Sequence, residues 1–199
     1  EKSGATAVGA PLLGARRTTA TKGTLTLSAG PQNPTSSSIA SNANNVPMVQ
    51  VQLTAGATED VRITDFAFHA SGSGNDLLDI ATGGVKLYQD NNADGHVDGG
   101  DVLVTGGQSY AFDNGTATFS GLNFVIPAGT TRTLLLTTGF NGNAANGASF
   151  SAGLSAVSDL TAVGDKTGLS ITPTGSLPVG GAKSVGGDQA PPVFQQGSP

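Results

Sequence analysis

The sequence predicts an all-β protein built as a β-sandwich. Apolar and polar residues alternate in short runs, as in 23–28 and 46–54, and this period of two is typical of a strand with one buried face. No long segment has apolar residues at helical spacing. Glycine provides 30 of the 199 residues, and charged residues make up only 12%. Because strong helix formers such as Glu and Lys are scarce, the composition favours strands joined by turns.

The alternating runs divide the chain into roughly seven to ten expected strands. Turn residues separate these runs, and the Asn-Gly pair inside 113–115 predicts a hairpin between the runs on either side of it. The Ser/Asn/Pro-rich segment 29–45 is expected to be a long loop. The expected strands are 23–28, 46–54, 59–71, 85–88, 102–104, 108–112, 116–119, 122–126, 131–140 and 148–154, and 169–172 is a weaker candidate for one last strand.

Three regions follow from this pattern. Residues 23–175 are expected to form the sandwich, because they contain all the alternating runs. Residues 1–22 are expected to form an N-terminal arm, and residues 176–199, which include a Pro-Pro pair, an extended C-terminal tail.

An acidic loop at 90–101 is the most specific feature of the sequence. Oxygen-bearing side chains occupy its positions 1, 3, 5, 9 and 12, which is the spacing of an EF-hand calcium loop. Gly95 lies at position 6, where such a loop turns most sharply, and position 7 would bind through the backbone carbonyl of His96. The flanking runs predict strands and not EF-hand helices. The candidate ligands are Asp90, Asn92, Asp94, His96, Asp98 and Asp101.

A second group of carboxylates is a weaker candidate for a metal site. Asp76 and Asp79 follow Asn75 closely, and Asp113 belongs to the turn at 113–115. These side chains could offer oxygens to a second calcium ion. Alternatively, the segment around Asn75 could cap a short helical turn.

Composition narrows the classes of function. There is no Cys, so disulfides and thiolate metal sites are excluded. The net charge is −5, and the basic residues near the N-terminus have no aromatic neighbours, which argues against nucleic-acid binding. The sequence contains no apolar run of about 18 residues, so no membrane-spanning helix is predicted. The many Asn, Gly, Ser and Thr residues and the start at Glu1 fit a secreted protein whose signal peptide has been removed.

The sequence offers little for catalysis. There are two histidines, and no nucleophile elbow, zinc-protease motif or phosphate loop is present. His69, at the end of an expected strand, is interpreted as a hydrogen-bonded strand residue and not a ligand. We therefore expect that the protein is not an enzyme.

The N-terminal arm has two possible interpretations. Its apolar stretch is interrupted by Gly9 and Pro11, so it cannot form a helix that stands alone. It is either a disordered terminus or a strand donated to a neighbouring subunit. The candidate donor residues are Ala5, Ala7, Val8, Leu12 and Leu13.

Several segments resemble known families. Val85-Lys86-Leu87-Tyr88-Gln89-Asp90 leading into the acidic loop, 115–122 and 126–131 resemble a calcium-binding, immunoglobulin-like module of prokaryotic cell-surface proteins, over roughly residues 46–155. The segment 22–28 is similar to the first strand of camelysin and TasA-like biofilm fibre subunits. The resemblance implies an immunoglobulin-like or jelly-roll-type sandwich in an extracellular filament or surface layer. It also implies head-to-tail homopolymers, joined by donor-strand complementation. The alternative is a calcium-dependent adhesion or carbohydrate-binding module, for which the absence of Trp leaves few stacking surfaces.

Overall fold

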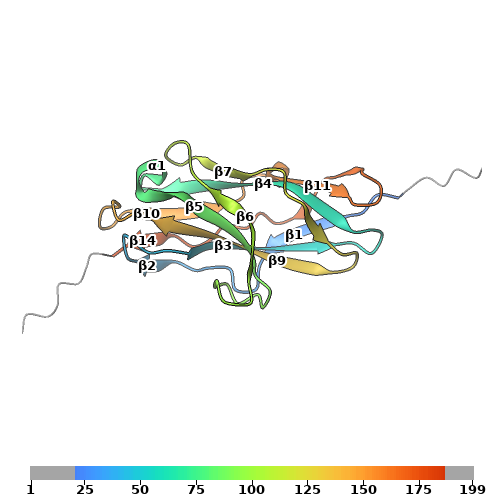
Figure 1. Cartoon of the computed structure of the whole chain (residues 1–199), viewed down its shortest axis with the longest axis horizontal. Coiled ribbons are helices and arrows are strands. Elements are labelled where there is room, and N and C mark those ends of the chain that lie inside the picture. The colour runs from blue at the N-terminus through green and yellow to red at the C-terminus, as the bar shows by residue number, and fades with distance from the viewer. Residues whose placement is uncertain (1–20, 187–199) are drawn as a thin grey trace, which may run out of the picture.

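Two mixed β-sheets pack face to face with almost no helix (Figure 1). The structure is a computed structural model and describes residues 21–186. The first sheet has six strands in the order β13 (Thr174–Gly175), β1 (Leu25–Ala29), β3 (Val46–Ala55), β9 (Thr131–Phe140), β5 (Ile80–Gln89) and β6 (Val102–Gln108). The expected all-β sandwich is therefore confirmed.

The second sheet is organised around its longest strand, β4 (Val61–Gly72). One edge of β4 pairs with β11 (Leu160–Gly164) and then β10 (Ser149–Gly153), and the other edge pairs with β8 (Phe124–Ile126) and then β7 (Thr116–Phe119). The sheet continues through β12 (Ser170–Ile171) beyond β11, and through β14 (Lys183–Val185) and β2 (Ser37–Ile39) beyond β10. Within residues 21–186 the helical elements are one turn of α-helix, α1 (Asp76–Asp79), and one 3-10 turn, η1 (Val157–Asp159).

The core lies between the sheets and is built from the inward faces that the alternation predicts. In β4 the aromatic residues Phe66 and Phe68 are fully buried, and Phe68 meets Phe119 edge to face at 6.2 Å between ring centroids. Phe140 and Phe150 form a second edge-to-face contact between the two sheets. Each such contact stabilises the core in addition to the stabilisation that comes from burying the rings.

The strands on either side of the turn 113–115 do not pair as expected. Asn114 does adopt a left-handed turn conformation, with φ 50°. The run after it, β7, nevertheless pairs with β4, and β6 ends at Gln108 and pairs with β5, so the expected hairpin between 108–112 and 116–119 is wrong. The turn was identified correctly, but the apolar side chains of β7 are buried against β4 instead.

Strands also appear where none was expected. β2 lies inside the segment expected to be a long loop, and β11 lies in the region where alternation weakens. β14 lies beyond the expected sandwich boundary at 175. It pairs with β10 and β2 in the second sheet, and its Lys183 and Val185 are buried there. The sandwich therefore includes the described residues of the expected C-terminal tail.

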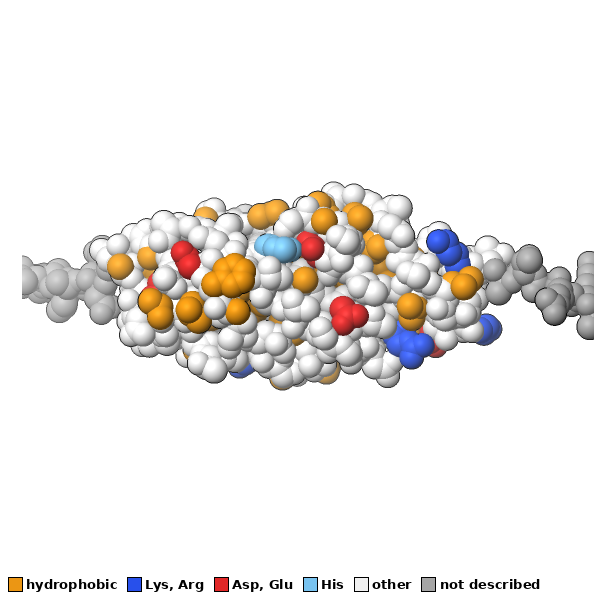
Figure 2. All heavy atoms as spheres, turned by 90° about the horizontal axis from the view of Figure 1, so that it is seen from above, with side chains coloured by type: hydrophobic (Ala, Val, Ile, Leu, Met, Phe, Trp, Pro, Cys, Tyr) orange, Lys and Arg blue, Asp and Glu red, His pale blue; other side chains and the backbone are white. Residues whose placement is uncertain are grey.

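The described chain enters and leaves the sandwich at opposite ends of its long axis (Figure 1). β1 begins beside the turn between β3 and β4, and β14 ends at the far end, where Gly147 N–H donates to Val185 O. Much of the surface seen in Figure 2 is uncharged, in keeping with the low content of charged residues. Within residues 21–186, no helix is long and apolar enough to cross a membrane.

Candidate metal centre

The acidic loop 90–101 connects β5 to β6 and folds over the outer face of the first sheet. Gly95 has a φ of 77°, and a Cβ at this position would lie 2.4 Å from the carbonyl oxygen of Gln32. Only glycine tolerates both the left-handed backbone and this close approach. The loop is therefore held against the segment that follows β1.

A polar side chain of the first sheet, Gln50, is buried beneath this loop. Gln50, on β3, is fully buried, and its side chain joins the two segments that cover it. Its Oε1 accepts from Gln32 N–H at 2.8 Å, and its Nε2 donates to Asp90 Oδ2 at 2.6 Å. Its cross-strand partner Leu135 is also fully buried, although it lies outside the main core cluster.

Asp90 is the most constrained carboxylate of the loop. Its residue surface is 2% exposed, and its Oδ2 accepts from Gln50 and also from Gly95 N–H at 3.0 Å. Its Oδ1 is buried and has no hydrogen-bond partner among the described residues. A buried carboxylate oxygen without a partner is costly, so this atom needs a donor or a cation.

The remaining candidate ligands bind one another and the backbone of their own loop. Asn92 Nδ2 donates to both Asp94 Oδ2 and Asp98 Oδ2, each at 2.9 Å. Asp101 accepts from Asp98 N–H and Asn91 N–H, each at 3.0 Å. The structure therefore places Asn92 between the carboxylates of positions 5 and 9.

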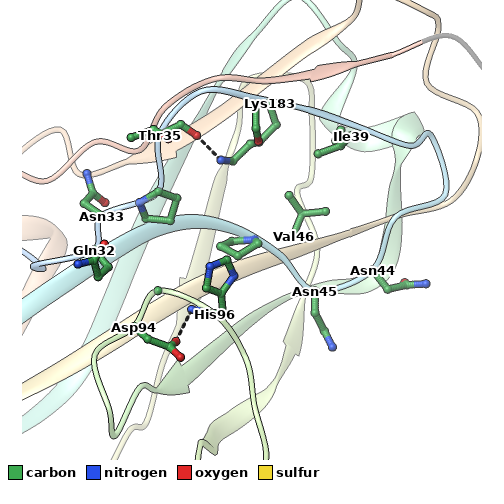
Figure 3. A pocket seen from close by; sticks show the side chains of 14 residues that line it. Gln32, Asn33, Thr35, Ile39, Asn44, Asn45, Val46, Asp94, His96 and Lys183 are labelled. Atoms are coloured by element: carbon green, nitrogen blue, oxygen red, sulfur yellow. Dashed lines mark hydrogen bonds between the residues drawn. The ribbon is translucent and has the colours of Figure 1, made fainter.

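The backbone N–H of His96 donates to Asp94 Oδ1 at 2.9 Å, and the imidazole lines a pocket beside the loop (Figure 3). Within the part of the chain that the structure describes, no three Asp, Glu, His or Cys side chains converge closely enough to hold a metal ion. Calcium binding by the loop stays a prediction.

The second aspartate group has a different arrangement. Asn75 caps α1 by accepting Leu78 N–H on Oδ1 at 3.1 Å, and Asp79 Oδ2 accepts Asn75 N–H at 2.9 Å. Asp76 and Asp113 are brought together: Asp76 N–H donates to Asp113 Oδ1 at 3.3 Å. The capped helical turn, which was the alternative interpretation, is confirmed.

Asp76 has a strongly shifted pKa. Burial raises the pKa to about 6, the hydrogen bond from Asn114 N–H opposes this rise, and the charge of nearby Asp113 adds to it. Ionisation of Asp76 therefore costs more free energy in the folded protein than it does in water.

His69 behaves as expected from the sequence. Its Nδ1 lies 3.1 Å from Thr116 Oγ1, and its Nε2 lies 3.1 Å from Asp159 Oδ1. Burial alone would raise the pKa of Asp159, but hydrogen bonds from Ala156 N–H and His69 outweigh burial and lower it. The histidine is a cross-strand hydrogen-bonded residue.

Sequence reasoning missed Gln50 and Lys183. Alternation assigns Gln50 to a polar, solvated face of its strand, and Lys183 belongs to the expected C-terminal tail. Both are buried by segments distant in the chain. The candidate donor residues Ala5, Ala7, Val8, Leu12 and Leu13 lie outside the described residues.

No family model matches the chain, and no curated protein sequence matches it significantly. The resemblance to immunoglobulin-like surface modules and fibre subunits stays a prediction.

Proposed function

We propose that this chain is a structural subunit of an extracellular filament or cell-surface layer, which assembles with copies of itself and is stabilised by calcium. The observation that carries the proposal is the free edge of β6, which begins directly after the acidic loop. In the described part of the chain, β6 is the last strand of the first sheet. An edge strand presents unpaired N–H and C=O groups to any extended chain that reaches it.

Apolar side chains are exposed along this edge. Val102 is 56% exposed and Leu103 is 45% exposed. With Val104, and with Asn123 and Phe124 at β8 on the opposite sheet, they line a hollow of about 260 Å³. A hollow between two sheet edges can accept side chains while the edge pairs with a backbone.

The proposed occupant is the N-terminal arm of a second copy. Its residues 5–13 contain small and apolar side chains suited to such a hollow, namely Ala5, Ala7, Val8, Leu12 and Leu13. Donor and acceptor are different surfaces, so the contact propagates into an open polymer and does not close into a dimer. The opposite positions of the two described chain ends suit a head-to-tail arrangement (Figure 1). The resemblance to immunoglobulin-like modules and fibre subunits points the same way.

Calcium has a structural role in this proposal. The ligands would be Asp90, Asn92, Asp94, Asp98, Asp101 and the His96 carbonyl. The unpartnered Oδ1 of Asp90 fits a cation, and rotation of the Asn92 amide would exchange its NH₂ for an oxygen ligand between Asp94 and Asp98. Because the loop leads directly into β6, a bound ion would fix the start of the edge strand.

The test is assembly in calcium, followed by negative-stain microscopy and light scattering. We expect filaments from the full chain and none after deletion of residues 1–15. We also expect Leu103→Lys to block assembly, because a charge would face the apolar hollow. The control is Leu169→Lys, since Leu169 is equally exposed, at 46%, on the turn between β11 and β12. Unchanged filaments after the deletion would refute donor-strand assembly, and unchanged filaments in Leu103→Lys would refute β6 as the acceptor.

A further inference from the structure

A second hollow lies beside the tip of the acidic loop, at Asp94, Gly95 and His96. It has a volume of about 460 Å³ and opens between the tip of the loop, the segment 32–39 and the beginning of β3 (Figure 3). Three segments that are far apart in the sequence supply its walls, and Lys183 of β14 also lines it, beside Thr35 (Figure 3). The proposed assembly does not use this hollow.

Lys183 is a buried cation without an acidic partner in the described chain. Only 4% of its surface is exposed, and its Nζ donates to the carbonyl oxygen of Thr35. Among residues 21–186, ion pairs form at Arg62–Asp165 and His69–Asp159 and not at this lysine. Burial lowers the pKa of Lys183. A buried ammonium with one neutral acceptor retains donors and charge that an anion would satisfy.

The rest of the wall suits a polyhydroxylated molecule. Asn44, Asn45, Ser37 and His96 line the hollow, so both donors and acceptors are available. The carboxylate residue Asp94 lines it too, so an acidic ligand must direct its own carboxylate toward Lys183 and its hydroxyl groups toward Asp94 (Figure 3). Ile39, Val46 and Pro47 provide apolar surface on which the C–H groups of a sugar ring can pack. There is no Trp in the chain, so a neutral sugar would lack a stacking platform, and charge would have to provide the main anchor.

An extended peptide fits this hollow less well. Peptides that bind at a sheet edge rely on a backbone ladder. The nearest edge strand, β2, has only three residues and therefore offers a short ladder. The polar residues around the hollow are mainly amide- and hydroxyl-bearing, with Asp94, His96 and Lys183 in addition.

We propose that this hollow binds an acidic saccharide, with the carboxylate of a uronic-acid residue held by Lys183 and its hydroxyl groups held by the surrounding amides. A protein subunit at a cell surface would in this way attach to an acidic polysaccharide. The site would operate in a single subunit as well as in a polymer. The proposal is therefore independent of whether the chain forms filaments.

The test is a titration of the full chain with glucuronic acid, followed by NMR of the backbone amides and by calorimetry at constant calcium. We expect shifts at Thr35, Asn45 and His96, and weaker binding at high salt because the anchor is ionic. Glucose, which lacks the carboxylate, should cause none of these shifts. Lys183→Met should weaken binding at least about tenfold, which corresponds to about 1.4 kcal/mol. Lys166→Met, which removes an exposed lysine at the other end of the sandwich, should leave it unchanged.

Three outcomes would overturn the proposal. Equal binding of glucose and glucuronic acid would show that Lys183 is not the anchor. Tighter binding of a short glutamate peptide than of glucuronic acid would indicate a protein partner. If Lys183→Met does not fold, the wild-type titration still decides: shifts confined to residues outside the hollow, or no shifts, would refute the site.

Discussion

The two aspartate groups of this protein, 90–101 and 75–79 with 113, are similar in the sequence and different in the structure. In the second group the polar atoms of Asn75, Asp76 and Asp79 receive backbone N–H groups from α1 and the neighbouring turn. In the acidic loop, backbone donors also reach the carboxylates, but Asp90 Oδ1 has no partner in the described chain, and Asn92 lies between two carboxylates. Helix capping and the neighbouring turn therefore explain the group at 75–79 and 113. In the acidic loop, one buried carboxylate oxygen still lacks a hydrogen-bond donor or a cation.

The difference shows how burial separates two uses of the same residue type. Asp76 and Asp90 are both almost fully buried, at 3% and 2% exposure. Burial of Asp76 raises its pKa. Asp90 instead accepts hydrogen bonds from Gln50 and Gly95 on one carboxylate oxygen, and its other oxygen has no partner in the described chain. We therefore expect calcium to change stability through the acidic loop 90–101, and pH to change stability through Asp76.

Calcium should have the largest effect on stability. An ion that binds only the folded state adds about 2.7 kcal/mol at a concentration of one hundred times its dissociation constant. We expect urea unfolding of the full chain to show a gain of this size when calcium replaces EDTA, and Asp94→Asn to remove most of it. Asp113→Asn, the same change in the second group, should leave the gain intact. Equal gains in both variants would place the ion elsewhere.

The contact between the loop and Gln32 should also be strong. In Gly95→Ala, a left-handed alanine costs about 1–2 kcal/mol, and its Cβ also meets the Gln32 carbonyl. We expect a total loss of about 2 kcal/mol in chemical unfolding without calcium. Gly99→Ala is the matched control in the same loop, because nothing lies within 4 Å of its added Cβ. Similar losses in the two variants would mean that the loop is not held against this segment.

Asp76 should make stability depend on pH. Its pKa is about 6 in the folded protein and 3.8 in the unfolded chain, so ionisation opposes folding fully above pH 6, and the cost disappears as the pH falls to about 4. Asp76→Asn keeps an acceptor for Asn114 N–H, and it should stabilise the protein by about 2 kcal/mol near pH 8 and by much less near pH 4. Thermal unfolding at both pH values checks this.

Calcium should not change the pH profile of Asp76. If calcium removes the difference between wild type and Asp76→Asn, the second group binds the ion, and the contrast between the two groups is wrong.

The smallest effect is expected at the cap of α1. Asn75→Ala removes the acceptor for Leu78 N–H and should cost about 1 kcal/mol of unfolding free energy. This loss should be the same with calcium and with EDTA. A loss that depends on calcium would connect the cap to ion binding.

Local chemistry was sufficient to predict much of this molecule. Alternation identified β3, β4, β7, β9 and β10, because a strand with one buried face has a period of two in any partner arrangement. The left-handed turns at Gly95 and Asn114 were also predictable, because few residue types adopt that backbone. The cap at Asn75 follows the same rule of short range, since donor and acceptor lie within one turn.

Only the tertiary structure decided which strands are neighbours and which polar groups are buried. β7 pairs with β4 and not with 108–112, because burial of its apolar side chains depends on a strand about 50 residues away. Gln50 and Lys183 look like solvated residues in the sequence, yet distant segments cover both. Burial removes water from a polar group. Such a residue therefore requires a specific hydrogen-bond or ionic partner only once the distant segments cover it. For this reason the sequence by itself determined the strands, the turns and the ligand spacing. The tertiary structure decided that, among residues 21–186, Asp90 Oδ1 has no hydrogen-bond donor and Lys183 has no acidic partner.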